Sequence, residues 1–460
     1  MQKTPMDYNI TTENIELIPI SGKTTLFFHS DSLQIYPLND KVLINFLLSI
    51  KNYGIEITKQ KYKNNKFCEL YNYIIKKINT SPITTIYPDL DNQNKKYITI
   101  VLPISAKCNL NCPYCFAKTD NGYNFQNFTT QSINEIAEFL INNIKENEHL
   151  TIIFFGGEPL LNMEVIKYTV TLFKTKYPNQ SINYSITTNG TILDKRIITF
   201  FKENKFSVLL SIDGPDNEFN LRKYKNGKSS FSKVMKNIEL LKKNNIGFEL
   251  RATLINNNPY IVETFEFFEN LHIPFNIVFA YNSENKANSH LNTYDVNIIY
   301  QIEEQLDALL KYYIDKFKRQ EKSFNIFFKS ISEVLRYRLN KSTICSAGIY
   351  YHTIMSNGDI YTCAHLMNDN RYKIGNIHSG YNSNSAYFPV PIHQIYECQT
   401  CWIKNICLGG CPSQKISMGK KNDIAMENNI CHLEKIKTRF YIKLYYYATK
   451  NFPNYFTNEN

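Results

Sequence analysis

The sequence lacks the long apolar segments that would place the protein in or across a membrane. No run of 18 or more apolar residues occurs among its 460 residues, so no membrane-spanning helix is expected. The first residues, MQKTPMDYNITTENIE, contain none of the apolar stretch that a signal peptide needs. We therefore expect a cytoplasmic protein that has no membrane partner.

Acidic residues are fewer than basic residues, but the basic residues form no dense run. The chain has 52 Lys and Arg against 41 Asp and Glu, a formal net charge of +11. A positive net charge can attract either nucleic acid or an acidic peptide. Because the basic residues here are scattered, we do not expect nucleic-acid binding.

Cysteine is the residue in excess, with eleven copies. In a reducing cytosol these favour metal binding or catalysis over disulfides.

Apolar β-rich runs alternate with amphipathic helical runs between about residues 97 and 320. In one of the helical runs, Phe231, Val234, Ile238 and Leu241 fall on one face. Six strands that alternate with helices predict right-handed βαβ units and a parallel sheet covered on both faces. We expect an α/β fold, a partial (β/α)6 barrel of the TIM type. Its strand candidates are 97–104, 150–155, 182–188, 207–213, 248–254 and 275–280.

The segments on either side of this barrel differ from it in pattern. The strand-like runs TTLFFHS and SLQIYPL, followed by helical runs at 40–54 and 67–78, predict a small N-terminal α+β module. Long helices are expected at about 294–320 and 326–340, and the chain becomes loop-rich after Cys345. The predicted domains are residues 1–96, 97–320, 321–435 and a C-terminal helix or tail at 436–460.

The segment CNLNCPYCF places Cys108, Cys112 and Cys115 in a C-x3-C-x2-C arrangement directly after the first barrel strand. Barrel folds carry out their chemistry at that C-terminal rim. Three thiolates on one loop can hold three irons of a [4Fe–4S] cube and leave the fourth iron open. A zinc site or buried free thiols are the alternatives, although a closed zinc site needs four ligands.

This motif, followed by the aromatic Phe116, resembles the signature of the radical S-adenosylmethionine (radical SAM) superfamily. The resemblance implies that the open iron is chelated by the amino and carboxylate groups of S-adenosylmethionine. One electron from the reduced cluster then makes a 5′-deoxyadenosyl radical, which abstracts a hydrogen atom from the substrate. A reductant such as flavodoxin or ferredoxin would supply that electron.

Further segments stand at strand ends in the order that this family shows. GGEP at 156–159 is similar to the family motif beside the methionine amino group, and TTNG at 187–190 and SIDG at 211–214 follow on the next strands. Taken singly these are ordinary turn sequences, but their order on one rim favours a cofactor site. The resemblance implies cofactor contacts at Gly156, Gly157, Glu158, Asn189, Ser211, Asp213, Arg222 and Leu254; Arg251 lies on the same strand as Leu254.

Seven further cysteines follow, with Gly358 between the first two of them. Their spacing is similar to the SPASM extension of radical SAM enzymes that mature peptides. The resemblance implies two auxiliary [4Fe–4S] clusters, and so three clusters in all. It assigns Cys345, Cys363 and Cys411 to the first, and Cys398, Cys401, Cys407 and Cys431 to the second. A pair of zinc ribbons is the alternative, but seven cysteines leave two such sites one ligand short.

The chain departs from the sulfatase-maturing relatives at Tyr351, where they carry a further cysteine six residues after the first. The inner auxiliary cluster is therefore expected to have an open iron, with a substrate thiol, Cys68 or His352 as candidates to fill it. Cys68 is otherwise expected to be an ordinary buried residue. Trp402, the only tryptophan, is expected to pack beside the cluster or the substrate.

The favoured function is a peptide maturase that installs a thioether or similar cross-link in a ribosomally made precursor peptide. An oxidative bond of this kind releases an electron, which an auxiliary cluster can accept. The N-terminal module would then bind a leader peptide as an added strand, unless it only extends the barrel. The alternatives are an anaerobic sulfatase-maturing enzyme that forms formylglycine, and a non-catalytic iron–sulfur or zinc module. The sequence identifies no catalytic acid or base.

Overall fold

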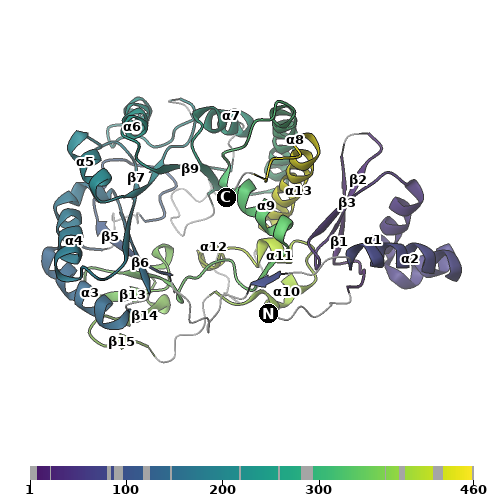
Figure 1. Ribbon diagram of the computed structural model, residues 1–460, viewed down its shortest axis with the longest axis horizontal. Helices are drawn as coiled ribbons and strands as arrows, with labels where there is room; N and C mark the ends of the chain where they lie inside the picture. The colour runs from purple at the N-terminus through teal and green to yellow at the C-terminus, as the bar shows by residue number, and fades with distance from the viewer. Residues whose placement is uncertain are drawn as a thin grey trace.

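The computed structural model describes most of the chain, and Figure 1 shows its arrangement. The β/α units lie at one end of the long axis, the N-terminal module lies at the other, and long helices stand between them. None of the helices in the described ranges is long and apolar enough to cross a membrane. The described residues are 8–20, 22–79, 84–86, 97–117, 125–145, 148–216, 219–256, 260–280, 294–367, 369–382, 389–417 and 428–457.

Six parallel strands form the predicted barrel sheet and neighbour one another in chain order. Every one of the six predicted strands is confirmed, with ends that differ by no more than two residues. The strands are β5 (Tyr97–Ser105), β6 (His149–Gly156), β7 (Ile182–Thr188), β8 (Ser207–Ser211), β9 (Phe248–Leu254) and β10 (Phe275–Phe279).

One helix follows each of these strands, which confirms the partial (β/α)6 architecture. Ile152 and Phe154 of β6 are fully buried against the helices. Because side chains alternate across a strand, the residues between them face the barrel interior. The helices are α3 (Thr130–Asn143), α4 (Met163–Lys176), α5 (Lys195–Glu203), α6 (Phe231–Lys243), α7 (Ile261–Leu271) and α8 (Val296–Lys318).

The C-terminal cysteine region is more regular than the loop-rich segment that the sequence predicts. β12 (Tyr351–Ile354) pairs parallel with β5, and β13 (Asp359–Tyr361), β14 (Lys373–Asn376) and β15 (Gly380–Tyr381) continue the sheet. Gly358 makes the β12–β13 turn with φ +84°, where a Cβ would lie 2.7 Å from Ile377. This hairpin brings Cys345, which precedes it, close to Cys363, which follows it.

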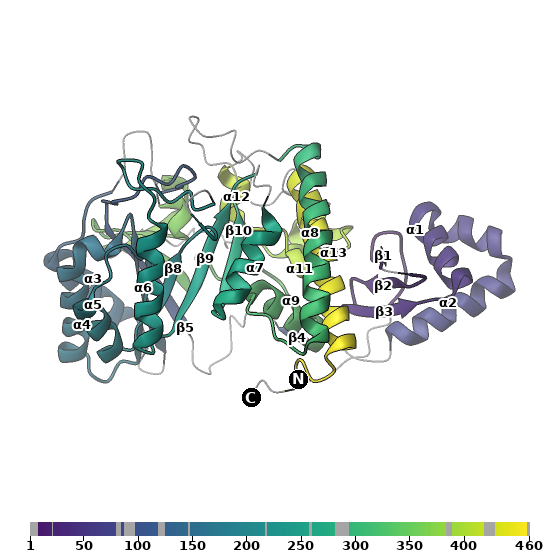
Figure 2. The same ribbon diagram turned by 90° about the horizontal axis from the view of Figure 1, so that it is seen from above.

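The helices that follow the barrel pack between the barrel and the N-terminal module. α13 (Asn428–Asn451) packs along α8, as Figure 2 shows, and runs through residue 436, where the sequence suggests a boundary. α9 (Ile326–Tyr337) is shorter than predicted because Arg338 adopts φ 52°. Residues 339–341 instead form β11, which pairs with β4 (Thr84–Ile86). The shorter helices are α10 (Tyr396–Gln399), α11 (Lys404–Cys407), α12 (Pro412–Ser417), η1 (Pro159–Asn162), η3 (Ala364–Leu366), η4 (Asn370–Tyr372) and η5 (Ile392–Gln394).

The N-terminal module is a three-stranded antiparallel sheet followed by two helices. Its strands are β1 (Ile15–Pro19), β2 (Thr25–His29) and β3 (Gln34–Leu38), of which β1 is not anticipated by the sequence. Asp40 caps α1 (Lys41–Tyr62) by accepting a hydrogen bond from the Val42 N–H at 2.7 Å. α1 is kinked at Gly54, which has φ 82°, and α2 (Asn64–Ile78) follows it.

Trp402 joins this module to the cysteine-rich region. One face of the N-terminal sheet packs on α1 and α2, and the other packs on Trp402, Leu335 and Ile442. The Trp402 indole meets the Phe28 ring edge-on at 5.9 Å between centroids. Trp402 is therefore a packing residue, as expected, and its partner is the N-terminal sheet.

Candidate active site

The loop that carries the first three cysteines follows β5 and is tied to the end of β7. Asn109 Nδ2 donates to Thr191 Oγ1 at 2.8 Å, and Asn189 Nδ2 donates to Asn109 Oδ1 at 2.9 Å. Cys108 Sγ accepts from the Leu110 N–H at 3.4 Å and from Asn189 Nδ2 at 3.7 Å. Hydrogen bonds to sulfur are one means by which proteins tune cluster thiolates. Asn189 therefore lies at the site predicted for it and supports the cysteine loop.

The thiols fall into three sets whose members act on one another electrostatically. Burial above all, together with the neighbouring thiols, raises the pKa of Cys112 and of Cys363 to about 12 and that of Cys398 to about 11. The sets have the same members as the ligand sets expected from the sequence, while ligation itself stays a prediction. They are Cys108, Cys112 and Cys115; Cys345, Cys363 and Cys411; and Cys398, Cys401, Cys407 and Cys431.

The donor chemistry of these sets fits iron–sulfur cubes. In the part of the chain that the structure describes, no three His, Cys, Asp or Glu side chains converge as ligands of one metal ion. The thiolates of a cube bind separate irons, so they need not converge in that way. Buried thiols must lose their protons to bind metal, which couples cluster assembly to pH.

The GGE turn packs on the residues that precede Cys108. Gly156 has φ +129°, and a Cβ there would lie 2.5 Å from the Ser105 carbonyl oxygen, so only glycine fits. The Gly157 N–H donates to Ser105 O, and the Glu158 N–H donates to Lys107 O, both at 2.7 Å. The ends of β5 and β6 are thereby held together beside the cysteine loop.

The Glu158 carboxylate is fully buried and faces protein groups. It accepts hydrogen bonds from Thr188 Oγ1 at 2.7 Å, the Asn189 N–H at 2.8 Å and the Leu160 N–H at 3.1 Å. Burial raises its pKa to about 7, although these hydrogen bonds act in the opposite direction. The side chain of Glu158 thus positions the ends of β6 and β7, and any cofactor contact at this residue falls to its backbone.

Glu158 makes the stability of the protein depend on pH. Because its folded pKa is about 7 against an ordinary value of 4.5, the folded state binds more protons between these values. Stability should therefore fall as the pH rises from about 4.5 to about 7, by at most about 3 kcal/mol. Denaturant unfolding of wild type and Glu158→Gln across this range tests this, since the variant should lack the decline. Parallel pH profiles of the two proteins would contradict the assignment.

A buried ion pair joins β8 to the segment that follows it. Arg222 Nε donates to Asp213 Oδ1 at 2.9 Å, and the Thr253 N–H donates to the same oxygen at 3.1 Å. The Tyr114 hydroxyl, from the cysteine loop, donates to the other oxygen of Asp213. The Arg222 guanidinium lies 5.5 Å from the centre of the Tyr114 ring. Burial opposes the charge of Arg222, but Asp213 outweighs it and the pKa of Arg222 is raised.

Tyr114 is a site residue that sequence reasoning did not name. Its signal is its position inside the C-x3-C-x2-C segment, between Cys112 and Cys115. The hydrogen bond to Asp213 fixes the cysteine loop to the end of β8. Sequence alone cannot show that contact, because the two residues are far apart in the chain.

The two remaining predicted cofactor residues have different surroundings. Ser211 faces the barrel interior, because its neighbours Leu210 and Ile212 are buried under the helices. Leu254 is 1% exposed and packs in the core between sheet and helices. The structure does not bring the Leu254 side chain to the other polar groups, so its cofactor role stays a prediction.

Tyr351 stands beside the second thiol set. Burial raises the pKa of Tyr351, and Cys363 and Cys345 add to the rise, whereas the charge of Arg251 lowers it. His352 is the next residue on β12, so its side chain points to the opposite face, where its Nδ1 lies 3.0 Å from the Tyr381 hydroxyl. Cys68 is exposed on α2, so the expectation that it is buried is wrong. Of the three, Tyr351 alone adjoins Cys345 and Cys363.

His365 connects the first and second thiol sets. Its ring stacks on Phe116, which follows Cys115, with centroids 3.8 Å apart. It also lies two residues after Cys363. Desolvation by the surrounding protein and then the charge of Arg251 lower the pKa of this imidazole.

The cysteine loop at the C-terminal rim of a parallel barrel has a counterpart in known proteins. A model of the Radical SAM superfamily matches residues 102–268. The chain has a radical SAM domain. Such a domain implies one [4Fe–4S] cluster and S-adenosylmethionine, and it makes this protein a radical SAM enzyme.

Relatives of this radical SAM enzyme extend beyond that domain. A cysteine-type anaerobic sulfatase-maturating enzyme of Clostridium perfringens is 28% identical over 356 residues, which cover 72% of this chain and 92% of the relative. A serine-type enzyme of the same name from Bacteroides thetaiotaomicron is 27% identical and covers 70% and 84%. The solved structure of anSMEcpe with bound AdoMet and Cp18Cys peptide has the same fold, with a TM-score of 0.60, 23% identity and coverage of 79% and 100%.

Proposed function

We propose that this radical SAM enzyme is a maturase with three [4Fe–4S] clusters that forms a thioether or similar oxidative cross-link in a ribosomally made precursor peptide. The observation that carries the proposal is the position of the second thiol set. Cys345 and Cys363 flank a hairpin that extends the barrel sheet next to β5, the strand that leads into Cys108. This position supports the proposal, because the second thiol set adjoins the same barrel interior as the first.

In this proposal, different residues of the barrel rim would hold the cluster and S-adenosylmethionine. Cys108, Cys112 and Cys115 would hold the cluster, and the backbone of Gly156 to Glu158 would receive the methionine amino group. Ser211 and Arg222 would supply polar contacts to the rest of the cofactor. When bound, the cluster and S-adenosylmethionine supply a 5′-deoxyadenosyl radical. The barrel interior would shield the reacting atoms from water.

The overall chemistry explains why further thiol sets are useful. Joining a carbon to a thiol sulfur removes one C–H and one S–H hydrogen from the peptide. One hydrogen atom goes to the adenosyl radical, while one proton and one electron must leave by another route. The second set, with Cys411 close to Arg251, would hold the acceptor for that electron. A flavodoxin or ferredoxin would supply the electron that starts the reaction.

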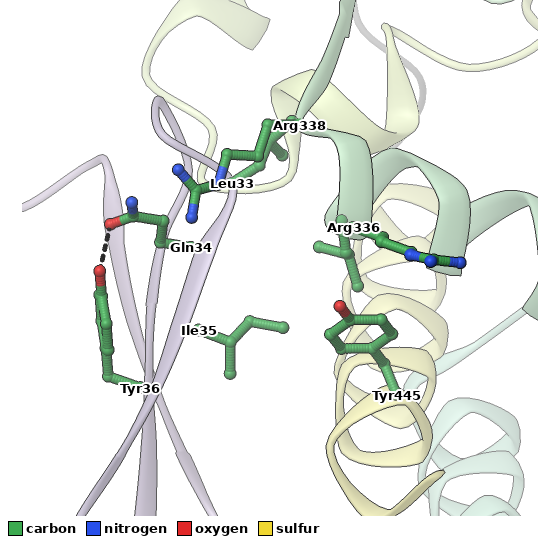
Figure 3. Close-up of a pocket in the computed structure, with 8 residues that line it drawn as sticks. Leu33, Gln34, Ile35, Tyr36, Arg336, Arg338 and Tyr445 are labelled. Atoms are coloured by element: carbon green, nitrogen blue, oxygen red, sulfur yellow. Dashed lines mark hydrogen bonds between the residues drawn. The ribbon is translucent and has the colours of Figure 1, made fainter. Parts of the chain in front are cut away.

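The N-terminal module suits the binding of a leader peptide by strand addition. In the described residues β3 pairs only with β2, so its outer edge is available. A pocket lies beside that edge, lined by Ile35 and Tyr36 of β3 and by Arg336, Arg338 and Tyr445 (Figure 3). Two arginines there favour an acidic leader. In this proposal residues 1–96 recognise the leader, 97–320 form the barrel and 321–435 form the SPASM domain.

Formylglycine formation is the second candidate, because the similarity to anaerobic sulfatase-maturating enzymes covers most of the chain. Two features separate this chain from that activity. Tyr351 occupies the place of their additional cysteine, and the matched region covers 72% of this chain but 92% of the Clostridium relative. The additional part of this chain is consistent with the module described above.

Mass spectrometry of the reaction product tests the proposal. The anaerobically reconstituted enzyme, S-adenosylmethionine and dithionite are incubated with short Cys-containing peptides translated from the open reading frames that flank the gene. We expect the loss of two hydrogen atoms, a fragmentation pattern with a linked Cys, and no reaction with a hydrazide probe. A product that reacts with hydrazide would instead support formylglycine. Cofactor cleavage with no change in the peptide would contradict both functions.

A further inference from the structure

Three polar side chains lie side by side on the inner face of the barrel. Arg251 of β9 is paired in register with Ser211 of β8 on one side and with Asn276 of β10 on the other. Their strand neighbours, including Leu250 and Phe275, are fully buried under the helices. By alternation, all three polar side chains point into the barrel.

Within the described part of the chain, the Arg251 guanidinium and the Asn276 side-chain oxygen have no hydrogen-bond partner. Among the described residues, no hydrogen bond or ion pair involves the Arg251 guanidinium, and burial is the first cause that lowers its pKa. The Asn276 Oδ1 is buried and accepts no hydrogen bond. Leaving a charge and a polar oxygen unpaired in the interior is costly. An unpaired charge next to an unpaired oxygen is expected where a bound ligand supplies the missing partners.

Electrostatic neighbours place Arg251 on the side of the second thiol set. Arg251 acts on Cys411, Tyr351 and His365, while Arg222 acts on Cys112 of the first set. Arg222 is already paired with Asp213, whereas Arg251 has no acidic partner among the residues that the structure describes. The Arg251 guanidinium thus lies beside the second thiol set, on the inner face that the reacting part of a peptide must reach.

We propose that Arg251 and Asn276 form a carboxylate-binding subsite of the reaction chamber, filled by an acidic residue of the peptide substrate. The inference rests on the proposed maturase function. The guanidinium would bind the carboxylate, and Asn276 Oδ1 would accept an N–H of the same residue. A carboxylate is favoured over a neutral group because it would compensate the buried charge of the Arg251 guanidinium. The carboxylate of S-adenosylmethionine is the other possible source, and the test separates the two.

Peptide binding to the reconstituted enzyme with S-adenosylmethionine provides the first test. The probe is a fluorescein-labelled precursor peptide translated from an open reading frame that flanks the gene. It is compared with a copy in which every Asp and Glu of the segment after the leader is Asn or Gln, while the leader is unchanged. Arg251→Gln should bind the acidic peptide roughly tenfold to a hundredfold more weakly, as expected for loss of a charged hydrogen bond. It should bind the neutral copy as wild type does. Arg251→Lys should retain part of the preference.

The control is Arg196→Gln, which alters an arginine on α5 whose side chain is 92% exposed; it should leave both peptides unaffected. If Arg251→Gln weakens both peptides equally, the subsite is wrong. If instead it weakens S-adenosylmethionine binding, Arg251 serves the cofactor and the proposal is overturned. The affinities of wild type for the acidic and neutral peptides are also compared, and this comparison does not depend on how the variant folds.

A second measurement does not depend on the proposed maturase function. Calorimetric titration with N-acetylglutamate amide, a minimal acidic residue, should show weak binding to the wild-type holoenzyme and none to Arg251→Gln. Should wild type bind this probe but modify no peptide, the maturase function fails while the subsite stands. Absence of binding to wild type, together with equal affinity for the acidic and neutral peptides, would overturn the subsite.

Discussion

Replacing Cys112 with alanine is expected to abolish 5′-deoxyadenosine formation, which is the largest effect predicted for this protein. Cys112 belongs to a set of three thiols, and a cube held by two thiolates would lose its attachment. Cys112 is also close to Arg222 and Asp213, the polar groups of the proposed cofactor site. Chromatography of the reaction mixture after reduction with dithionite measures the product directly.

The matched control is Cys68→Ala, because Cys68 is exposed on α2. This variant should cleave the cofactor at the wild-type rate. We expect roughly twelve irons in wild type and roughly eight in Cys112→Ala, as three cubes and then two cubes require. Normal cleavage by Cys112→Ala would refute the role of the loop. About four irons with bound zinc in wild type would refute the auxiliary clusters.

Asp213→Asn is expected to produce the largest loss of stability among single polar substitutions at this rim. The side chain of Asp213 is 1% exposed and that of its partner Arg222 is 13% exposed. Removal of the negative charge leaves the guanidinium buried without compensation, which costs about 3–5 kcal/mol in comparable buried pairs. The contact that fixes Tyr114, and with it the cysteine loop, would weaken as well.

Urea unfolding of the apoprotein under anoxic conditions measures this loss. Asp315→Asn is the matched control, because Asp315 pairs with Lys318 on α8 and both side chains are 61% exposed. Exposed pairs of this kind contribute little, so the control should unfold at the wild-type urea concentration. If the two variants lose equal stability, the Asp213–Arg222 pair does not tie the rim together.

The barrel could be predicted because its evidence is local. Each strand is a short apolar run and each helix an amphipathic one, so 182–188 and 248–254 were located without error. The predicted helix at 326–340 was too long because a residue in the left-handed region, Arg338, ends it. The pairing of β11 with β4 joins segments more than 250 residues apart, and no local pattern reports such a contact.

The candidate site was predictable in its residue types and less so in its contacts. The resemblance to the SPASM extension implied the grouping of the seven later cysteines into two sets. The cofactor contact expected at Glu158 stays a prediction, and what the sequence could not show is that the carboxylate accepts hydrogen bonds from Thr188, Asn189 and Leu160. Cys68, expected to be buried, is exposed because it lies on the outer face of α2.

The sequence by itself determined the parallel α/β barrel and the rim on which Cys108 to Cys115 lie, whereas the membership of the two later thiol sets came from the resemblance to a known family. Periodicity and spacing are properties of the chain alone, so they can be read before it folds. Only the tertiary structure decided that Tyr114 holds Asp213, that Trp402 meets the N-terminal sheet, and that Arg251 lies unpaired beside Asn276. Those facts depend on strand register and on packing between distant segments, which arise only when the whole chain is folded.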